Sequence, residues 1–244
     1  MFDIVILHGP NDDSIIHKNI ELNSKNVIGY NKIYIITHNK NLKIDNCIII
    51  HEEIFPFKKS DIEVYINCKQ RCGWYLQQLL KLYAHNCINQ LLDYYLVIDS
   101  DTLFLKETNF FYNDIPLYYF GTEYHLDYFD HIKRFLPDLS KQNNTSGICH
   151  HMIFNRIILE EIFLKVETLH NDIFWKIFLQ CINDKCKNAL DITAGASEYE
   201  IYYNYLIKYH YDKMKIRHLK RTDCSSIPTY SYYDYVSLHH YMRK

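Results

Sequence analysis

Short apolar runs separated by polar turns recur along the chain, and this pattern predicts a protein of mixed α/β structure. Residues 2–7, 32–37 and 47–50 form such runs, and their length and apolar character are typical of buried strands. Between the first two runs, isoleucine and leucine recur near helical spacing, which predicts a helix over residues 15–22. The N-terminal part therefore has the predicted order strand, helix, strand, strand.

The middle of the chain adds a longer helix and another strand. Residues 55–71 lose the apolar periodicity and carry Pro56 among charged side chains, so we expect a surface loop there. Residues 72–88 then predict a helix. Residues 94–98 give the strongest strand signal in the middle of the chain.

Shorter elements fill the C-terminal part. Strands are expected at residues 102–105, 117–121, 148–154, 217–219 and 235–239, and helices at 128–136, 157–180 with a break near 170–172, and 197–205. Neither a linker nor an internal repeat interrupts these elements. We therefore predict an α/β protein with a single domain over residues 1–244 and a mixed central sheet flanked by helices.

Composition narrows the classes of function. The 244 residues are 48% hydrophobic, enough for a full core, and the net charge is −2 without a basic stripe, so nucleic acid is not an expected partner. No apolar run approaches the roughly 20 residues of a membrane span. The first eight residues are too short and too acidic for a signal peptide, so we expect a cytoplasmic protein, in the host cytoplasm if the chain is viral.

Cysteine and tyrosine are common but carry little specific information. The eight cysteines, including the neighbours Cys181 and Cys186, show no pattern of a disulfide framework or a zinc site, so we expect reduced thiols. The 23 tyrosines are consistent either with platforms for sugar rings or with an AT-rich coding sequence.

Asp99-Ser100-Asp101 is the strongest candidate for chemistry. Two carboxylates one residue apart follow a buried strand, and this edge of an open α/β sheet is where ligands bind. A divalent cation held there can offset the charge of a diphosphate leaving group. The alternatives are a solvated strand end and the nucleophilic Asp-x-Asp of phosphatases. Leu103 and the late position of the motif argue against the phosphatase.

Histidines near strand ends could complete such a site. His239-His240 follows a late strand, and only one of the two can face a metal because neighbours on a strand point in opposite directions. A surface pair near the terminus is the alternative. His8-Gly9 follows the first strand and is placed to meet a nucleotide base or ribose. His150-His151 precedes an apolar run, and we expect one of the two to line the acceptor side and the other to lie in the core.

Polar groups also mark the helix over residues 72–88. Arg71 lies at its start, where a guanidinium and a helix N-terminus together favour phosphate. Gln77 and Gln78 are polar positions on an otherwise apolar helix, so we expect one or both to contact the donor. A solvent-facing position is the alternative for each.

Ser197-Glu198-Tyr199-Glu200 resembles a helix start with a capping box, in which Glu200 reaches back to the first turn. Glu198 is not needed for capping. We expect its carboxylate to be free and to act as a general base. The alternative is an exposed acid that the helix dipole stabilises.

Together these residues resemble the GT-A fold nucleotide-sugar glycosyltransferases, and in particular a family of small stand-alone members from bacteria and large DNA viruses. The likeness is carried by residues 73–82, the Asp99–Asp101 triplet, Ser197–Glu200 with Tyr202 and Asn204, and the late histidine. Residues 106–145 depart from the family pattern.

The resemblance implies a Rossmann-like GT-A fold, a sugar donor on a nucleoside diphosphate, usually UDP, and Mn²⁺ or Mg²⁺ between the carboxylates and the diphosphate. Asp101 would be the firmer metal ligand, and Asp99 would lie nearer the ribose or the metal, with Ser100 also at the nucleotide. Residues 1–105 would form the nucleotide-binding half and residues 106–244 the acceptor-side half, for a glycan or glycoprotein.

The sequence thus predicts a metal-dependent glycosyltransferase. Asp99 and Asp101 hold the metal, His239 or His240 completes its shell, and Arg71 helps to hold phosphate. Glu198 is a base if the sugar configuration is inverted and a sugar ligand if it is retained. The alternative is a catalytically inactive nucleotide-sugar or glycan-binding protein on the same fold.

Overall fold

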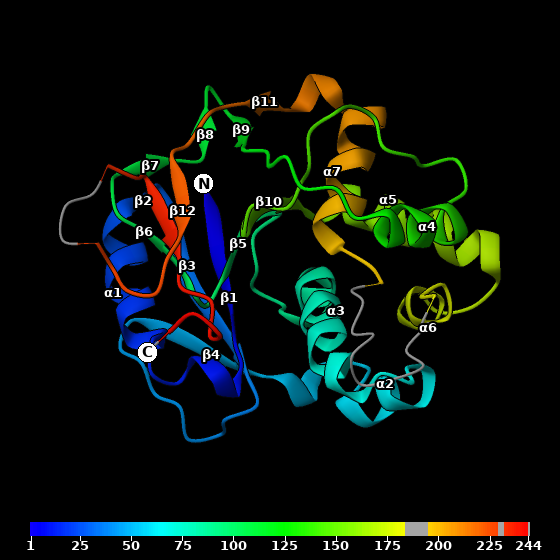
Figure 1. Ribbon diagram of the computed structural model, residues 1–244, viewed down its shortest axis with the longest axis horizontal. Coiled ribbons are helices and arrows are strands. Elements are labelled where there is room, and N and C mark those ends of the chain that lie inside the picture. Colours follow the sequence, from blue (N-terminus) through cyan, green and yellow to red (C-terminus); the bar gives the residue numbers. More distant parts are fainter. Residues whose placement is uncertain (184–194, 229–231, 244) are drawn as a thin grey trace.

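A mixed five-stranded sheet forms the centre of the computed structural model, which describes residues 1–183, 195–228 and 232–243 (Figure 1). The strand order is β10-β5-β1-β3-β4, and all neighbours are parallel except β10, which is antiparallel to β5. The strands are β1 Phe2–His8, β3 Tyr30–Thr37, β4 Cys47–His51, β5 Tyr94–Asp99 and β10 His151–Asn155. This arrangement confirms the predicted α/β class and the mixed sheet.

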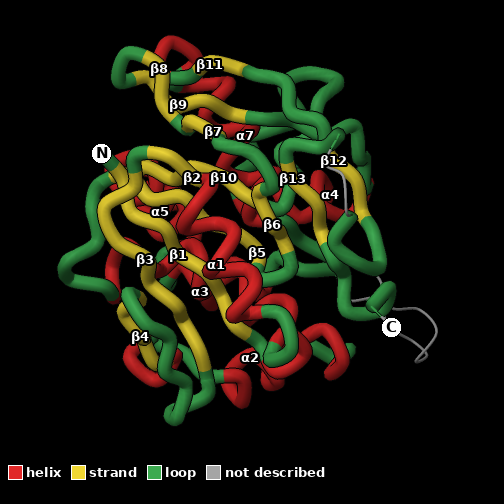
Figure 2. The backbone as a smooth tube through the Cα atoms, turned by 90° about the vertical axis from the view of Figure 1, so that its left-hand side faces the viewer, coloured by secondary structure: helices red, strands yellow, loops and turns green. Residues whose placement is uncertain are grey.

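Helices cover both faces of the central sheet (Figures 1 and 2). Helix α1 (Ile16–Asn26) lies on one face, and α3 (Cys72–Cys87) and α5 (Arg156–His170) lie on the other. Because β1 is the middle strand and both of its faces are covered, every residue of this strand is buried.

The remaining elements surround this core. In the described part of the chain, three smaller sheets have the strand orders β11-β9-β8, β12-β13-β6 and β2-β7. Their strands are β2 Val27–Ile28, β6 Thr102–Phe104, β7 Thr108–Asn109, β8 Phe111–Tyr112, β9 Ile115–Tyr118, β11 Lys215–Ile216, β12 Arg221–Asp223 and β13 Tyr235–Ser237. The other helices are α2 Lys59–Tyr65, α4 Leu126–Phe135, α6 Phe174–Gln180 and α7 Glu198–Tyr209. Four 3₁₀ turns are η1 Pro10–Asp12, η2 Glu52–Ile54, η3 Lys69–Arg71 and η4 Tyr211–Lys213.

The prediction of a surface loop at residues 55–71 is wrong in part, because α2 and η3 form within these residues. Asp61 caps the start of α2, where its carboxylate accepts a hydrogen bond from the Lys58 backbone N–H at 2.8 Å. Ile62 is fully buried. A helix this short depends on tertiary packing rather than on its own periodicity, so the sequence pattern does not reveal it.

Several other boundaries differ from the prediction. The strand expected at residues 217–219 is wrong: those residues connect β11 and β12. The strand expected at 117–121 begins and ends earlier, as β9. The break between α5 and α6 is confirmed, because Asn171 ends α5 in the left-handed conformation at φ 54°.

Three further findings bear on the sequence predictions. No helix in the described ranges has the length and apolar character needed to cross a bilayer. No disulfide joins cysteines in the described part of the chain. Cys186, and Ala194 ahead of α7, lie outside the described residues.

Candidate functional site

A cavity of about 950 Å³ opens at the carboxyl edge of the central sheet. Here β1, β3, β4 and β5 end, and in an open α/β sheet this edge is where ligands bind. The residues predicted from the sequence to carry function all line it: His8, Gly9, Arg71, Gln77, Gln78, Asp99, Ser100, Asp101, Glu198, His239 and His240. The fold therefore brings together side chains from both ends of the chain.

Asp99 ends β5 and is held by the sheet itself. Its backbone N–H donates to the His150 carbonyl at 2.9 Å, which places His150 beside it at the start of β10. The Asp99 carboxylate lies 2.6 Å from the Lys81 ammonium and 3.3 Å from the His150 ring, and accepts a hydrogen bond from Tyr199 at 3.0 Å. Burial raises the pKa of Asp99, but Lys81 and His150 outweigh it and leave that pKa below its ordinary value.

Lys81 is the buried centre of this charge cluster, and the sequence pattern assigned it no role. Its ammonium donates to Asp99 at 2.6 Å, to Glu198 at 2.7 Å and to the Tyr199 hydroxyl at 3.2 Å. The side chain is 3% exposed. Burial lowers the pKa of Lys81, yet the two carboxylates raise it by more, so the lysine stays charged.

The expectation that Glu198 has a free carboxylate is wrong. Its side chain is 4% exposed and bound to Lys81. Burial raises the pKa of Glu198, and Lys81 offsets only part of that rise. Sequence reasoning missed the pair because Lys81 lies 117 residues away, on α3. The proposed base is therefore fixed in position beside Asp99.

Helix α7 is clamped at its first turn by Gln78. The Gln78 amide donates to the Ala196 carbonyl at 3.2 Å and accepts from the Glu198 backbone N–H at 3.0 Å. Ser197 caps the helix, and its hydroxyl accepts from the Glu200 N–H at 3.3 Å. The buried Gln78 thus holds the peptide groups that position Glu198, while Gln77 is half-buried on the cavity wall.

Glu200 differs from the expected capping box. Its carboxylate accepts from the Ser146 hydroxyl at 2.5 Å and from the Asn204 amide at 2.9 Å rather than reaching back to the helix start. Its role is structural, as expected, but it anchors the loop ahead of β10.

Asp101 and His239 contact each other in the same cavity. Strand β13 pairs with β6, and the Leu238 N–H donates to the Asp101 carbonyl at 2.8 Å, which brings His239 to the end of the Asp-x-Asp motif. The His239 Nδ1 lies 3.0 Å from an Asp101 carboxylate oxygen. This hydrogen bond raises the pKa of His239. His240 is exposed, so His239 is the member of the pair that reaches Asp101.

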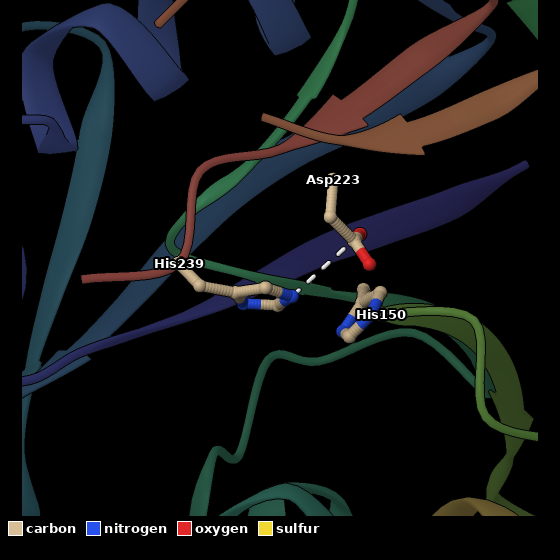
Figure 3. A group of neighbouring side chains, drawn as sticks. All are labelled: His150, Asp223 and His239. Carbon is tan, nitrogen blue, oxygen red and sulfur yellow. Dashed lines mark ion pairs between the residues drawn. The ribbon is translucent and has the colours of Figure 1, made fainter. Parts of the chain in front are cut away.

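Two further residues complete this corner of the cavity (Figure 3). Asp223, at the end of β12, lies 3.6 Å from His239 Nε2. Potential ligand atoms of His150, Asp223 and His239 all lie within 4.8 Å of one another. The sequence does not decide which of His150 and His151 faces a site; in the structure His150 lines the cavity and His151 is buried. Asp223 could not be predicted, because β12 has no strong strand pattern to mark its end.

The predicted nucleotide residues at the first strand already have protein partners. His8 Nδ1 lies 3.0 Å from the Thr37 hydroxyl, and its Nε2 lies 3.0 Å from Asp13. Burial lowers the pKa of His8 despite that carboxylate. Gly9 begins η1. Ser100 is buried and donates to Asp12 at 2.5 Å.

Arg71 also lines the cavity, at the N-terminus of α3. Its guanidinium lies over the Trp74 ring, 5.6 Å from the ring centre. Helix α3 therefore presents its positive end and an arginine to the same cavity as the Asp-x-Asp carboxylates.

The donor set of this corner fits a divalent cation. Carboxylate oxygen and imidazole nitrogen are ligands for Mn²⁺, and Asp101 and His239 are already in contact. Asp99 fits less directly, since Lys81 and Tyr199 occupy one of its oxygens. Mg²⁺ prefers oxygen ligands, so the histidine favours a transition metal.

The chain belongs to a family of unknown function, DUF6492, whose model matches residues 27–240. No curated protein matches the sequence. Among solved structures, the chain is similar to the apo form of mouse xyloside xylosyltransferase 1, with a TM-score of 0.48, 8% identity and 97% of each chain covered. At that identity, no residue role carries over to this chain.

Proposed function

We propose that this protein is a metal-dependent glycosyltransferase of the GT-A type, which moves a sugar from a nucleoside-diphosphate donor to a hydroxyl of a glycan or protein. UDP-sugars are the proposed donors. The observation that carries the proposal is the contact of Asp101 with His239, at the ligand-binding edge of the sheet and inside a cavity large enough for a nucleotide sugar.

The cavity is lined by groups of both charges, which suits such a donor. Asp99 and Asp101 line it, and so do Arg71 and the start of α3. A Mn²⁺ or Mg²⁺ ion bound in the corner formed by Asp101 and His239 would offset the charge of the departing diphosphate. Arg71 would bind phosphate oxygens, and His8, Gly9 and Ser100 form the wall proposed for the nucleoside.

Glu198 has two proposed roles, and its ion pair with Lys81 serves either of them. In an inverting reaction it would accept the proton of the acceptor hydroxyl. In a retaining reaction it would bind the sugar. Replacing Glu198 with Gln separates these roles: a base loses rate with donor affinity kept, whereas a binder loses both.

A donor screen tests the function. The protein is incubated with Mn²⁺ and each common nucleotide sugar, and release of nucleoside diphosphate is measured with and without EDTA. We expect release from UDP-sugars that EDTA abolishes, because the ion is required for departure of the diphosphate.

Asp101→Asn should lower the rate of nucleoside-diphosphate release by at least about 100-fold, while the far-ultraviolet circular dichroism spectrum stays unchanged. The matched control is Asp114→Asn, an exposed position with φ 62° in the turn between β8 and β9, where Asn is well tolerated. Activity that survives Asp101→Asn contradicts the metal role. Binding of UDP without turnover on a broad acceptor panel supports the inactive binding protein instead.

A further inference from the structure

His150, Asp223 and His239 converge from three separate segments of the chain. His150 precedes β10, Asp223 ends β12, and His239 follows β13. Figure 3 shows the two rings and the carboxylate grouped at one point, and their potential ligand atoms lie within 4.8 Å of one another.

Both imidazoles are oriented by the Asp-x-Asp motif. Asp99 lies 3.3 Å from His150 Nδ1, and Asp101 lies 3.0 Å from His239 Nδ1. In metal sites, a carboxylate that holds one ring nitrogen fixes the tautomer and directs the other nitrogen at the ion. The second nitrogen of His239 faces Asp223 at 3.6 Å.

The spacing suits a single ion. Two ligands at about 2.1 Å from one ion are about 3.0 Å apart at a right angle and about 4.2 Å apart when opposite. The 3.6 Å distance between His239 and Asp223 lies inside this range. All separations among the three ligand atoms are at most 4.8 Å, which is about half an ångström more than the separation of two opposite ligands.

The backbone at His150 supports the arrangement. This residue has φ 63°, a left-handed conformation that residues other than Gly seldom adopt. The hydrogen bond from the Asp99 N–H to the His150 carbonyl holds the peptide in place. The conformation directs the ring toward Asp99 and His239, whose ring centre is 4.9 Å away.

We propose that His150, Asp223 and His239 form an imidazole-rich cation site in which Asp99 and Asp101 orient the two rings. The ion is a first-row transition metal such as Mn²⁺ or Co²⁺, because two imidazoles with one carboxylate disfavour Mg²⁺ and Ca²⁺. This site deepens the proposed function. Only the use of the ion in sugar transfer rests on that function, whereas binding of the ion does not. It also assigns roles to His150 and Asp223.

The test is metal binding to the full chain without any nucleotide. Mn²⁺, Co²⁺ and Mg²⁺ are titrated separately by calorimetry, and pulsed EPR of bound Mn²⁺ reports nitrogen ligands. We expect Mn²⁺ and Co²⁺ to bind at least about 10-fold more tightly than Mg²⁺. The EPR spectrum should show coupling to two imidazole nitrogens.

Three variants locate the site. His150→Asn and Asp223→Asn should each weaken Mn²⁺ binding by at least about 10-fold, and His150→Asn should remove one nitrogen coupling. Asn is suited to the left-handed backbone at residue 150, and Asp223 has a 41% exposed side chain, so both variants should fold. His17→Asn, an exposed position on α1, is the control and should bind as the unaltered protein does.

The outcomes separate this inference from the proposed function. Mn²⁺ binding that depends on His150 and Asp223, without hydrolysis of any nucleotide sugar, supports the site and contradicts the function. Mn²⁺ binding unchanged in both variants overturns the site, even if UDP-sugar hydrolysis is observed. Thermal unfolding of each variant verifies that it is folded, and if His150→Asn is unfolded, Asp223→Asn decides alone.

Discussion

At the residue scale, the site depends on one buried lysine between two carboxylates. Lys81 binds Asp99 and Glu198 and lowers the pKa of both; burial outweighs this effect at Glu198, whereas Lys81 together with His150 outweighs burial at Asp99. A buried ion pair adds little net stability compared with an apolar pair, but loss of one partner leaves an uncompensated charge. Lys81 therefore holds the two acids in their positions.

Replacing Lys81 with Met tests this arrangement. The variant leaves Asp99 and Glu198 buried without their cation, so we expect the free energy of unfolding to fall by about 3–5 kcal/mol in urea denaturation. Lys18→Met is the control, because Lys18 and Glu21 form an exposed pair on α1. The control should lose less than about 1 kcal/mol. Equal losses in the two variants would contradict the account.

Sequence reasoning located single residues better than it located their partners. Asp101 and His239 could be proposed because each follows a recognisable strand. The partner of Glu198 could not, since nothing in the local pattern relates positions 117 residues apart. Asp223 was missed for the same reason: its proximity to His239 arises only when β12 pairs with β13.

At the element scale, α3 positions the start of α7. The two helices meet where Gln78 holds both the Ala196 carbonyl and the Glu198 N–H. Neighbouring glutamines on a helix point in different directions, which explains why Gln78 is buried while Gln77 lies on the cavity wall.

Gln78→Ala and Gln77→Ala form a matched pair. Gln78→Ala leaves a buried N–H and a buried carbonyl without partners, so we expect a loss of about 1–3 kcal/mol in the free energy of unfolding. Gln77→Ala should change stability by less than about 0.5 kcal/mol. If Gln77→Ala destabilises the protein as much as Gln78→Ala, the hydrogen bonds of Gln78 to Ala196 and Glu198 do not explain the loss of stability.

The elements themselves followed the sequence pattern where that pattern was long or strongly apolar. The helix over residues 72–88 and the strands of the central sheet were expected close to their observed bounds. Helix α2 was missed because its seven residues carry one buried side chain. Short edge strands such as β11 have no buried face to mark them.

At the scale of the whole molecule, several buried histidines make folding depend on pH. Burial lowers the pKa of His131 to about 4, and the ring contacts the Phe178 carbonyl at 2.9 Å. An unfolded histidine has a pKa of about 6.5, so unfolding between these pH values takes up a proton. Stability is therefore lost as the pH falls from about 6.5 to about 4.

His131→Gln tests this dependence. Gln keeps a donor for the Phe178 carbonyl but does not titrate, so the loss of stability between pH 6.5 and pH 4 should be smaller by up to about 3 kcal/mol. Urea denaturation at several pH values measures it, with His17→Gln on the exposed surface of α1 as control. An unchanged slope in His131→Gln would show that folding does not lower the pKa of His131.

In the proposed function, the cavity binds a nucleoside diphosphate through a cation held in the corner formed by Asp101 and His239. Calorimetric titration of UDP into the protein, with Mn²⁺ and then with EDTA, measures this binding. We expect UDP binding that requires Mn²⁺ and is lost in Asp101→Asn. UDP binding of equal strength with EDTA, or no binding in either condition, would contradict the proposed function.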